Sequence, residues 1–194
     1  MARPDWDVVV VAHRGMVSGF PENTLVAFRQ SILLGFAAIE IDLRATADGH
    51  IVVMHDDTVD RTTNGSGDVG EMTLAEIKSL DAGSRAGPAF ADQRVPTYEE
   101  VLGALRGSAT KIVLDIKPSE ALDNERVVRL TERFGAVLDV IVGPRSMADL
   151  RGFKRLNPNL RTLALVPGAE FEPPDVQAIE EFAHWRGHVA DGWC

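Results

Sequence analysis

The chain has 194 residues, of which 45% are hydrophobic and 25% are charged, and this length suffices for one sizeable hydrophobic core. We therefore expect a single domain over residues 1–194. The formal net charge is −9, and the sequence has no run of Lys or Arg. This composition argues against general electrostatic attraction to nucleic acid or to an anionic membrane, so any anionic ligand must be held by local groups.

The N-terminal region and the cysteine content indicate the compartment. The apolar run VVVVA at 8–12 is shorter than the apolar core of a signal peptide, and Asp5 and Asp7 precede it. No run reaches the length of a membrane span. The single cysteine, Cys194, excludes an intrachain disulfide. We therefore expect a soluble, cytoplasmic protein without a membrane span.

Short apolar runs alternate with helical patterns along the chain, which is typical of a parallel α/β sheet or barrel. The first run, at 8–12, leads to a helix near 24–34, for which Asn23 or Thr24 is the expected N-cap and Gly35 the terminator. Further strands are predicted at 38–43, 51–55, 111–116, 137–142 and 161–166, and further helices at 73–80, 97–106, 124–134, 146–156 and 174–186.

Two connections differ from the helix-sized links between the other strands. The turn TADG at 46–49 is a tight link between the second and third strands. Residues 56–95 form a connection that is long for a compact domain, which indicates a functional insertion.

Several of the apolar runs end in charged groups that a core would not hold. The segment AIEIDL places Glu40 and Asp42 two residues apart, so both carboxylates face the same side of a strand. Such close carboxylates repel each other unless a cation lies between them or one of them takes a proton, and ligation by oxygen alone suits Mg²⁺ or Ca²⁺. The segment IVLDIKP repeats the arrangement with Asp115 and Lys117.

The strand ends of a parallel barrel converge on one rim. Seven polar side chains are therefore predicted to share a pocket: His13, Arg14, Glu40, Asp42, His55, Asp115 and Lys117. Each also has a structural interpretation when taken alone. A lone histidine at a strand end is more often structural or solvated, the HDD sequence at 55–57 is consistent with a turn, and Asp115 with Lys117 is consistent with a plain ion pair.

The motifs around these residues are AHRG (12–15), PENT (21–24), EIDLRATADG (40–49), VVMHDDTVDRTTNGSG (52–67), VPTYEEVL (95–102) and LDIK (114–117). In order and spacing they resemble the glycerophosphodiester phosphodiesterase family. The resemblance implies a TIM barrel whose insertion, residues 56–95, caps the substrate side. It also implies hydrolysis of small-molecule glycerophosphodiesters to sn-glycerol 3-phosphate and an alcohol with a divalent cation.

Roles for individual residues follow from the same resemblance. His13 and His55 would be the acid/base pair, which suits imidazole near neutral pH. Arg14 and Lys117 would hold the substrate phosphate. The metal ligands, for Mg²⁺ or Ca²⁺, would be Glu40, Asp42 and Asp115. The nucleophile would be either water or the 2-hydroxyl of the glycerol.

The chain departs from the family's pattern at three places. The third acidic ligand is usually glutamate, whereas Asp115 is one methylene shorter. A Ser-Phe pair often follows the fifth strand, whereas this chain reads VGPRSM. The chain also ends at Cys194, after six expected strands, although a TIM barrel typically has about 250 residues. We therefore expect a barrel that stops before closure, whose open edges favour association, including a homo-oligomer.

Two functional hypotheses remain at this point. The first is a metal-dependent phosphodiesterase, which is favoured because all the proposed ligands precede residue 118. The second is a weakly active or inactive phosphate-binding fragment of the same fold. A phosphodiesterase directed at lysophospholipids is a further alternative within the first class.

Overall fold

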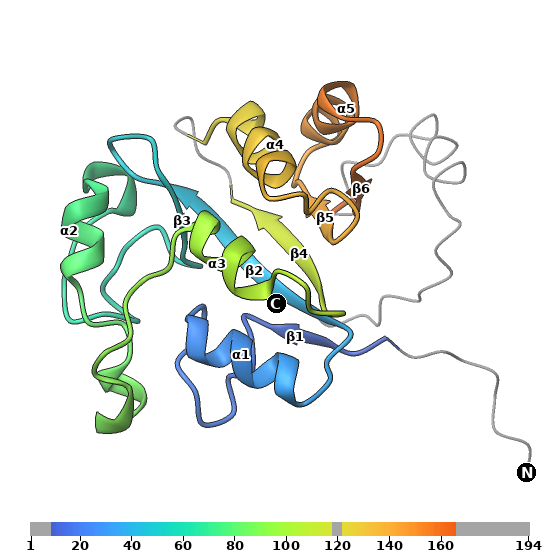
Figure 1. Cartoon of the computed structure of the whole chain (residues 1–194). Coiled ribbons are helices and arrows are strands. Elements are labelled where there is room, and N and C mark those ends of the chain that lie inside the picture. Colours follow the sequence, from blue (N-terminus) through green and yellow to red (C-terminus); the bar gives the residue numbers. More distant parts are fainter. Residues whose placement is uncertain (1–8, 118–121, 166–194) are drawn as a thin grey trace, which may run out of the picture.

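The computed structural model describes residues 9–117 and 122–165. A sheet at its centre has the strand order β1-β2-β4-β5-β6, and each neighbouring pair on this path is parallel. The strands are β1 (Val11–His13), β2 (Ala38–Ala45), β4 (Lys111–Ile116), β5 (Val140–Gly143) and β6 (Arg161–Thr162). This is the open, barrel-type parallel array that the sequence predicts. Figure 1 shows helices α1 and α3 beside one part of the sheet and helices α4 and α5 beside another.

Three of the helices beside the sheet start at side chains that cap them. α3 (Tyr98–Leu105) has a capping box between Thr97 and Glu100. α4 (Asn124–Arg133) and α5 (Met147–Leu156) begin with side-chain caps from Asp123 and Ser146. Together with α1 (Leu25–Leu33), these helices confirm the predicted order. Each of their ends lies within one residue of the predicted bound. The helix predicted at 174–186 lies outside the described residues.

The alternation of residues along β2 separates the core from the polar face. Ile39, Ile41 and Leu43 are fully buried in the main apolar cluster, whereas Glu40 and Asp42 point to the other face of the strand. The cluster also contains Phe28 of α1, Tyr98 of α3, Leu114 of β4, Val127 of α4 and Phe153 of α5. Burial of one face of β2 by the helices therefore fixes the direction of its two carboxylates.

The third predicted strand is present but does not join the parallel array. β3 (Ile51–Val53) is antiparallel to the end of β2, and its membership of the predicted barrel is wrong. The reason lies in the turn at 46–49, because a tight turn joins only antiparallel neighbours, whereas parallel neighbours need a crossover of a dozen or more residues.

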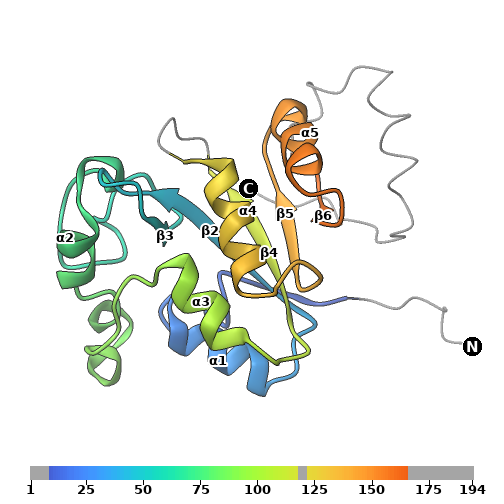
Figure 2. The same cartoon turned by 45° about the horizontal axis from the view of Figure 1, so that its top comes forward.

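The long connection at 56–95 is folded around a small core of its own. It contains η1 (Val69–Glu71), α2 (Leu74–Ser79), η2 (Ser84–Ala86) and η3 (Pro88–Phe90). The buried members of this second cluster are Val52, Met54, Val59, Val69, Ile77, Ala82 and Val95. Figure 2 shows this segment at the side of the sheet away from α5. The connection is therefore a structured insertion beside the carboxyl end of β2.

No helix within residues 9–117 and 122–165 has the length and apolar character needed to cross a membrane.

A substitution at Leu114 tests whether β4 lies at the centre of the main apolar cluster. Leu114→Ala removes a fully buried side chain, and we expect it to lower the free energy of unfolding by about 2–5 kcal/mol. The matched control is Leu33→Ala, because Leu33 is 80% exposed at the end of α1, and its effect should stay within about 0.5 kcal/mol. Urea unfolding measures both values, and equal losses would contradict this packing.

Candidate active site

Three carboxylates meet at the carboxyl ends of β2 and β4. The strands pair so that Asp42 lies beside Asp115, while His13 at the end of β1 lies beside Glu40. Oxygen atoms from Glu40, Asp42 and Asp115, one from each, all lie within 4.8 Å of one another. The three side chains are buried. The register of two parallel pairs therefore brings together the three residues that were predicted as metal ligands.

The cluster carries unfavourable charge. Burial, followed by the charge of Asp42, raises the pKa of Glu40 to about 8, although the backbone N–H of Arg14 donates to Glu40 Oε2 at 3.0 Å. A hard divalent cation has metal–oxygen distances of about 2.0–2.6 Å, so its oxygen ligands lie up to roughly 4–5 Å apart. Both the spacing and the purely carboxylate donor set fit Mg²⁺ or Ca²⁺.

Two cationic side chains also contact the cluster. Lys117 Nζ lies 2.7 Å from Asp42 Oδ1 and 2.5 Å from Asp115 Oδ2, so Lys117 is in the predicted pocket. Arg145, which the sequence analysis did not select, donates to Asp115 Oδ1 through Nε at 2.9 Å and to Oδ2 through Nη2 at 2.5 Å. Burial acts to raise the pKa of Asp115, but the hydrogen bonds from Arg145 and Lys117 hold it below its usual range.

The chain turns sharply after β1, and this turn directs Arg14 into the site. Arg14 and Gly15 have φ values of 58° and 84°, in the left-handed region that glycine tolerates best. A Cβ atom at Gly15 would lie 2.9 Å from Cδ1 of Phe28, so the close approach to α1 also requires glycine. Arg14 Nη1 donates to Glu22 Oε1 at 3.0 Å, and Arg14 Nε lies 3.5 Å from Asp42 Oδ2. The predicted convergence of Arg14 with the carboxylates is thus present.

Asn23 makes a side-chain hydrogen bond to a carboxylate of the site and does not cap α1. Its backbone has a φ of 53°, and its Nδ2 donates to Asp42 Oδ2 at 2.7 Å. The N-cap position of α1 is Thr24, which makes no side-chain cap and instead donates to the carbonyl of Pro21 at 2.7 Å. The predicted N-cap position at Thr24 is therefore confirmed, but its hydroxyl does not cap the helix, because it already has a partner in the preceding turn.

His13 and His55 approach the site from β1 and from the end of β3. His13 Nε2 lies 3.8 Å from Glu40 Oε2, and its side chain is 44% exposed. Burial and, next, the Arg14 guanidinium lower the pKa of His13 below its usual value. Arg44 of β2 donates to the carbonyl oxygen of His55 through Nε at 3.0 Å and Nη2 at 2.7 Å, which fixes the backbone at His55.

Asp56 determines which nitrogen of His55 is available. His55 Nδ1 and Asp56 Oδ1 are 2.7 Å apart. The hydrogen bond from Arg61, opposed by burial and helped by His55, holds the pKa of Asp56 far below its usual range. An ionised carboxylate only accepts hydrogen bonds, so Nδ1 is the donor and Nε2 is left for other partners. Asp56 of the HDD segment therefore fixes the orientation of the His55 imidazole, which is more than the structural role in a turn that the segment also allows.

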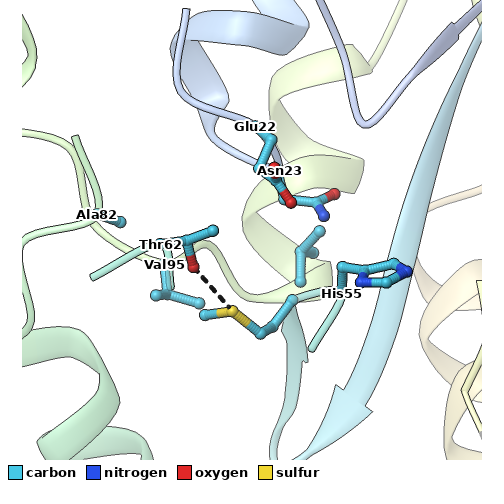
Figure 3. Close-up of a pocket in the computed structure, with 8 residues that line it drawn as sticks. Glu22, Asn23, His55, Thr62, Ala82 and Val95 are labelled. Carbon is cyan, nitrogen blue, oxygen red and sulfur yellow. Dashed lines mark hydrogen bonds between the residues drawn. The ribbon is translucent and has the colours of Figure 1, made fainter. Parts of the chain in front are cut away.

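Arg61 ties the insertion to the loop after β1. It donates through Nε and Nη2 to Asp56 at 2.7 and 3.0 Å, and through Nη1 and Nη2 to both oxygens of Glu22 at 2.7 Å. In Figure 3, Glu22, Asn23 and His55 line one side of a small pocket and Thr62, Ala82 and Val95 of the insertion line the other, while the His55 ring points away from the insertion. The insertion thus supports the orientation of His55.

Comparisons with known proteins place this geometry in context. Residues 13–180 match the model of the glycerophosphoryl diester phosphodiesterase family. A glycerophosphodiester phosphodiesterase of Caldanaerobacter subterraneus is 39% identical over 168 residues, which cover 85% of this chain and 69% of that protein.

Solved structures of phosphodiesterases are also similar to this chain in fold. A glycerophosphodiester phosphodiesterase of Agrobacterium tumefaciens superposes with a TM-score of 0.72 at 35% identity, covering 80% of this chain and 65% of its own. A phosphodiesterase of Oleispira antarctica, in complex with the product sn-glycerol-3-phosphate, superposes with a TM-score of 0.73 at 26% identity, covering 88% and 79%. The neighbours have the TIM-barrel fold, and the chain spans about two thirds of the length of several relatives that it matches.

The Asp56–Arg61 ion pair predicts a pH dependence of stability. The folded state lowers the pKa of Asp56, so the stabilisation is present above the unfolded value of about 4 and is lost as the pH falls below it. Asp56→Asn should therefore destabilise the protein at pH 7, by at most about 1 kcal/mol because the pair is partly exposed. The difference from wild type should narrow at pH 3.

Thermal unfolding at both pH values measures this effect, with Asp57→Asn as the neighbouring control. Asp57 is exposed and forms no ion pair within 4.0 Å among the described residues. A loss for Asp56→Asn that is the same at pH 3 and pH 7 would contradict the assignment.

Proposed function

Because the chain belongs to the glycerophosphoryl diester phosphodiesterase family, we propose that it hydrolyses glycerophosphodiesters to sn-glycerol 3-phosphate and an alcohol. The observation that carries this proposal is the meeting of three buried carboxylates with the His13 imidazole and fixed cations at one rim of the sheet. His55 lines the adjoining pocket with Glu22 and Asn23. The Oleispira antarctica phosphodiesterase, whose structure contains sn-glycerol-3-phosphate, supports the same class of product here.

We assign Glu40, Asp42 and Asp115 as the ligands of Mg²⁺ or Ca²⁺, since their oxygen atoms have the spacing and chemistry that such a cation requires. When bound there, the cation would polarise a phosphoryl oxygen and stabilise the charge that develops on it. Asn23 holds Asp42 through its amide, which restricts the rotation of that carboxylate within the cluster.

Arg14 and Lys117 are proposed to bind the phosphate. Arg14 is held by Glu22 on one side and lies near Asp42 on the other, so its guanidinium is already oriented before a ligand arrives. Lys117 is buried between Asp42 and Asp115 and adds a fixed positive charge. Positive groups preorganised in this way stabilise a transition state more strongly than flexible ones, because they do not need to reorient.

Proton transfer is assigned to the two histidines. The lowered pKa of His13 favours its neutral form, which accepts the proton of the nucleophile as the new O–P bond forms. His55 donates a hydrogen bond from Nδ1–H to Asp56, so Nε2 faces the other way, and a proton carried there goes to the leaving alkoxide as the old P–O bond breaks. Either water or the glycerol 2-hydroxyl fits this scheme as the nucleophile.

The proposal predicts metal-dependent release of sn-glycerol 3-phosphate from glycerophosphocholine. We expect activity with Mg²⁺ or Ca²⁺ and its loss on addition of a chelator. His13→Ala and His55→Ala should each lower kcat by about 100- to 10,000-fold. His50→Ala is the matched control, because His50 lies in the turn before β3, 4.0 Å from Asp48, and should leave kcat unchanged.

A coupled assay for sn-glycerol 3-phosphate measures these rates, and chromatography for the cyclic glycerophosphate identifies the nucleophile. Activity that survives both histidine substitutions or the chelator would contradict the mechanism. A folded wild-type chain without metal-dependent activity would favour the phosphate-binding hypothesis, and faster turnover of lysophosphatidylcholine would indicate a lysophospholipid substrate.

A further inference from the structure

Arg145 is a cation of the site to which the scheme above gives no task. We propose that Arg145 is a third phosphate-binding residue, and that it competes with the divalent cation for Asp115, so that binding of the cation releases its guanidinium to the substrate. The proposal rests on the proposed function for the identity of the substrate, while its two binding steps are measurable without turnover.

The position of Arg145 follows from the register of β4 and β5. Gly143, the last residue of β5, pairs with Asp115. A Cβ atom at Gly143 would lie 2.8 Å from the carbonyl oxygen of Leu114, so the glycine permits the close approach of the two strands. Arg145 follows two residues later, and the carbonyl of Pro144 between them accepts from the Leu165 backbone N–H at 3.1 Å. The loop therefore holds Arg145 at the rim beside Asp115.

Asp115 has little remaining capacity for a further ligand. A carboxylate offers about four lone-pair positions, and Arg145 uses one on each oxygen while Lys117 uses another on Oδ2. A divalent cation that binds Asp115 must therefore share an oxygen with the guanidinium or displace it, against the repulsion between the two positive charges. Because the coupling between two bound groups is reciprocal, each weakens the binding of the other.

Of the two cations on Asp115, Arg145 is the one that can leave. Lys117 is 6% exposed and is also held by Asp42, so moving it would leave two buried charges without their partner. The Arg145 side chain is 45% exposed, and releasing it returns a partly hydrated guanidinium to water at small cost. The buried face of the cluster thus stays intact while the rim changes.

The released guanidinium has the chemistry that a phosphate requires. Arg145 uses two of its five N–H groups on Asp115, and a guanidinium binds phosphate through two parallel hydrogen bonds. Of the other arginines at this rim, Arg14 is already assigned to the phosphate, Arg61 bridges Asp56 and Glu22, and Arg44 donates to the His55 carbonyl. Among the described residues, Asp115 is the only hydrogen-bond partner of Arg145.

A purely structural role for Arg145 makes the opposite prediction. If the ion pair only orients Asp115 as a ligand, its loss should weaken the binding of the cation. If Arg145 competes for Asp115, its loss should strengthen cation binding and weaken phosphate binding. The sign of the change in cation affinity therefore separates the two roles.

The test is calorimetric titration of the full chain with Mg²⁺ or Ca²⁺, and then with inorganic phosphate at saturating cation. For Arg145→Gln we expect the Kd of the cation to fall and the Kd of phosphate to rise, each by about fivefold or more. Arg145→Lys keeps the charge but loses the paired hydrogen bonds, so the Kd of phosphate should rise while that of the cation changes less. The matched control is Arg129→Gln, since Arg129 on α4 pairs with Asp123 and Glu125, and it should change neither value.

The outcomes distinguish this inference from the proposed function. Weaker cation binding by Arg145→Gln, or phosphate affinity unchanged in both Arg145 variants, would overturn the inference even if the wild type hydrolyses glycerophosphodiesters. If the Arg145 variants show the expected shifts in Kd but the wild type does not hydrolyse glycerophosphodiesters, the inference is upheld and the proposed function is refuted. A wild-type chain that binds neither the cation nor phosphate would overturn both. Circular dichroism of each variant confirms that the fold is retained.

Discussion

The repulsion among the buried carboxylates of Glu40, Asp42 and Asp115 is the constraint that the surrounding structure satisfies. Each of these groups is removed from water, and burying an unpaired charge is costly. Every neighbouring segment therefore contributes a donor or a cation: the turn after β1 supplies Arg14, the segment before α1 supplies Asn23, and the end of β4 supplies Lys117. The spacing that makes the cluster costly to bury is also the spacing that a divalent cation requires.

The apolar core is what makes this arrangement rigid. Ile39, Ile41 and Leu43 are locked between the sheet and the helices, so the alternate positions of β2 cannot rotate away from the site. A shift of one residue in the register would place the carboxylates in the core. The insertion adds a second constraint from outside the sheet, because Arg61 connects Asp56, and through it His55, to Glu22. Two separate apolar clusters therefore position the two halves of one site.

Local patterns in the sequence were sufficient for the parts of the site that lie on strands. The period of two along β2 placed Glu40 and Asp42 together, and the similar pattern in β4 placed Asp115 and Lys117 beside them. The short turn at 46–49 requires β3 to be antiparallel to β2, as the structure shows. The predicted barrel nevertheless counted this segment as a parallel strand. The contact between Arg61 and Glu22 joins residues 39 positions apart, and it depends on the path of the whole insertion. No local periodicity carries that information.

Arg145 shows how a strand boundary affects the assignment of function. The predicted fifth strand ended at 142, whereas β5 ends at Gly143 and pairs there with Asp115. Because β5 extends one residue farther than predicted, the loop that contains Arg145 begins at the rim. With that boundary, the polar residues expected just after a strand end would have included Arg145.

Asp115 and the VGPRSM segment were two separate departures from the family's pattern in the sequence, but in the structure they are in contact. The guanidinium of Arg145, which follows the next strand, compensates the buried charge of Asp115. The two substitutions are therefore better understood as one change in how the site balances its charge. The proposed third ligand is therefore defined by the pair of Asp115 with Arg145, because neither side chain can be replaced without altering the electrostatic environment of the other.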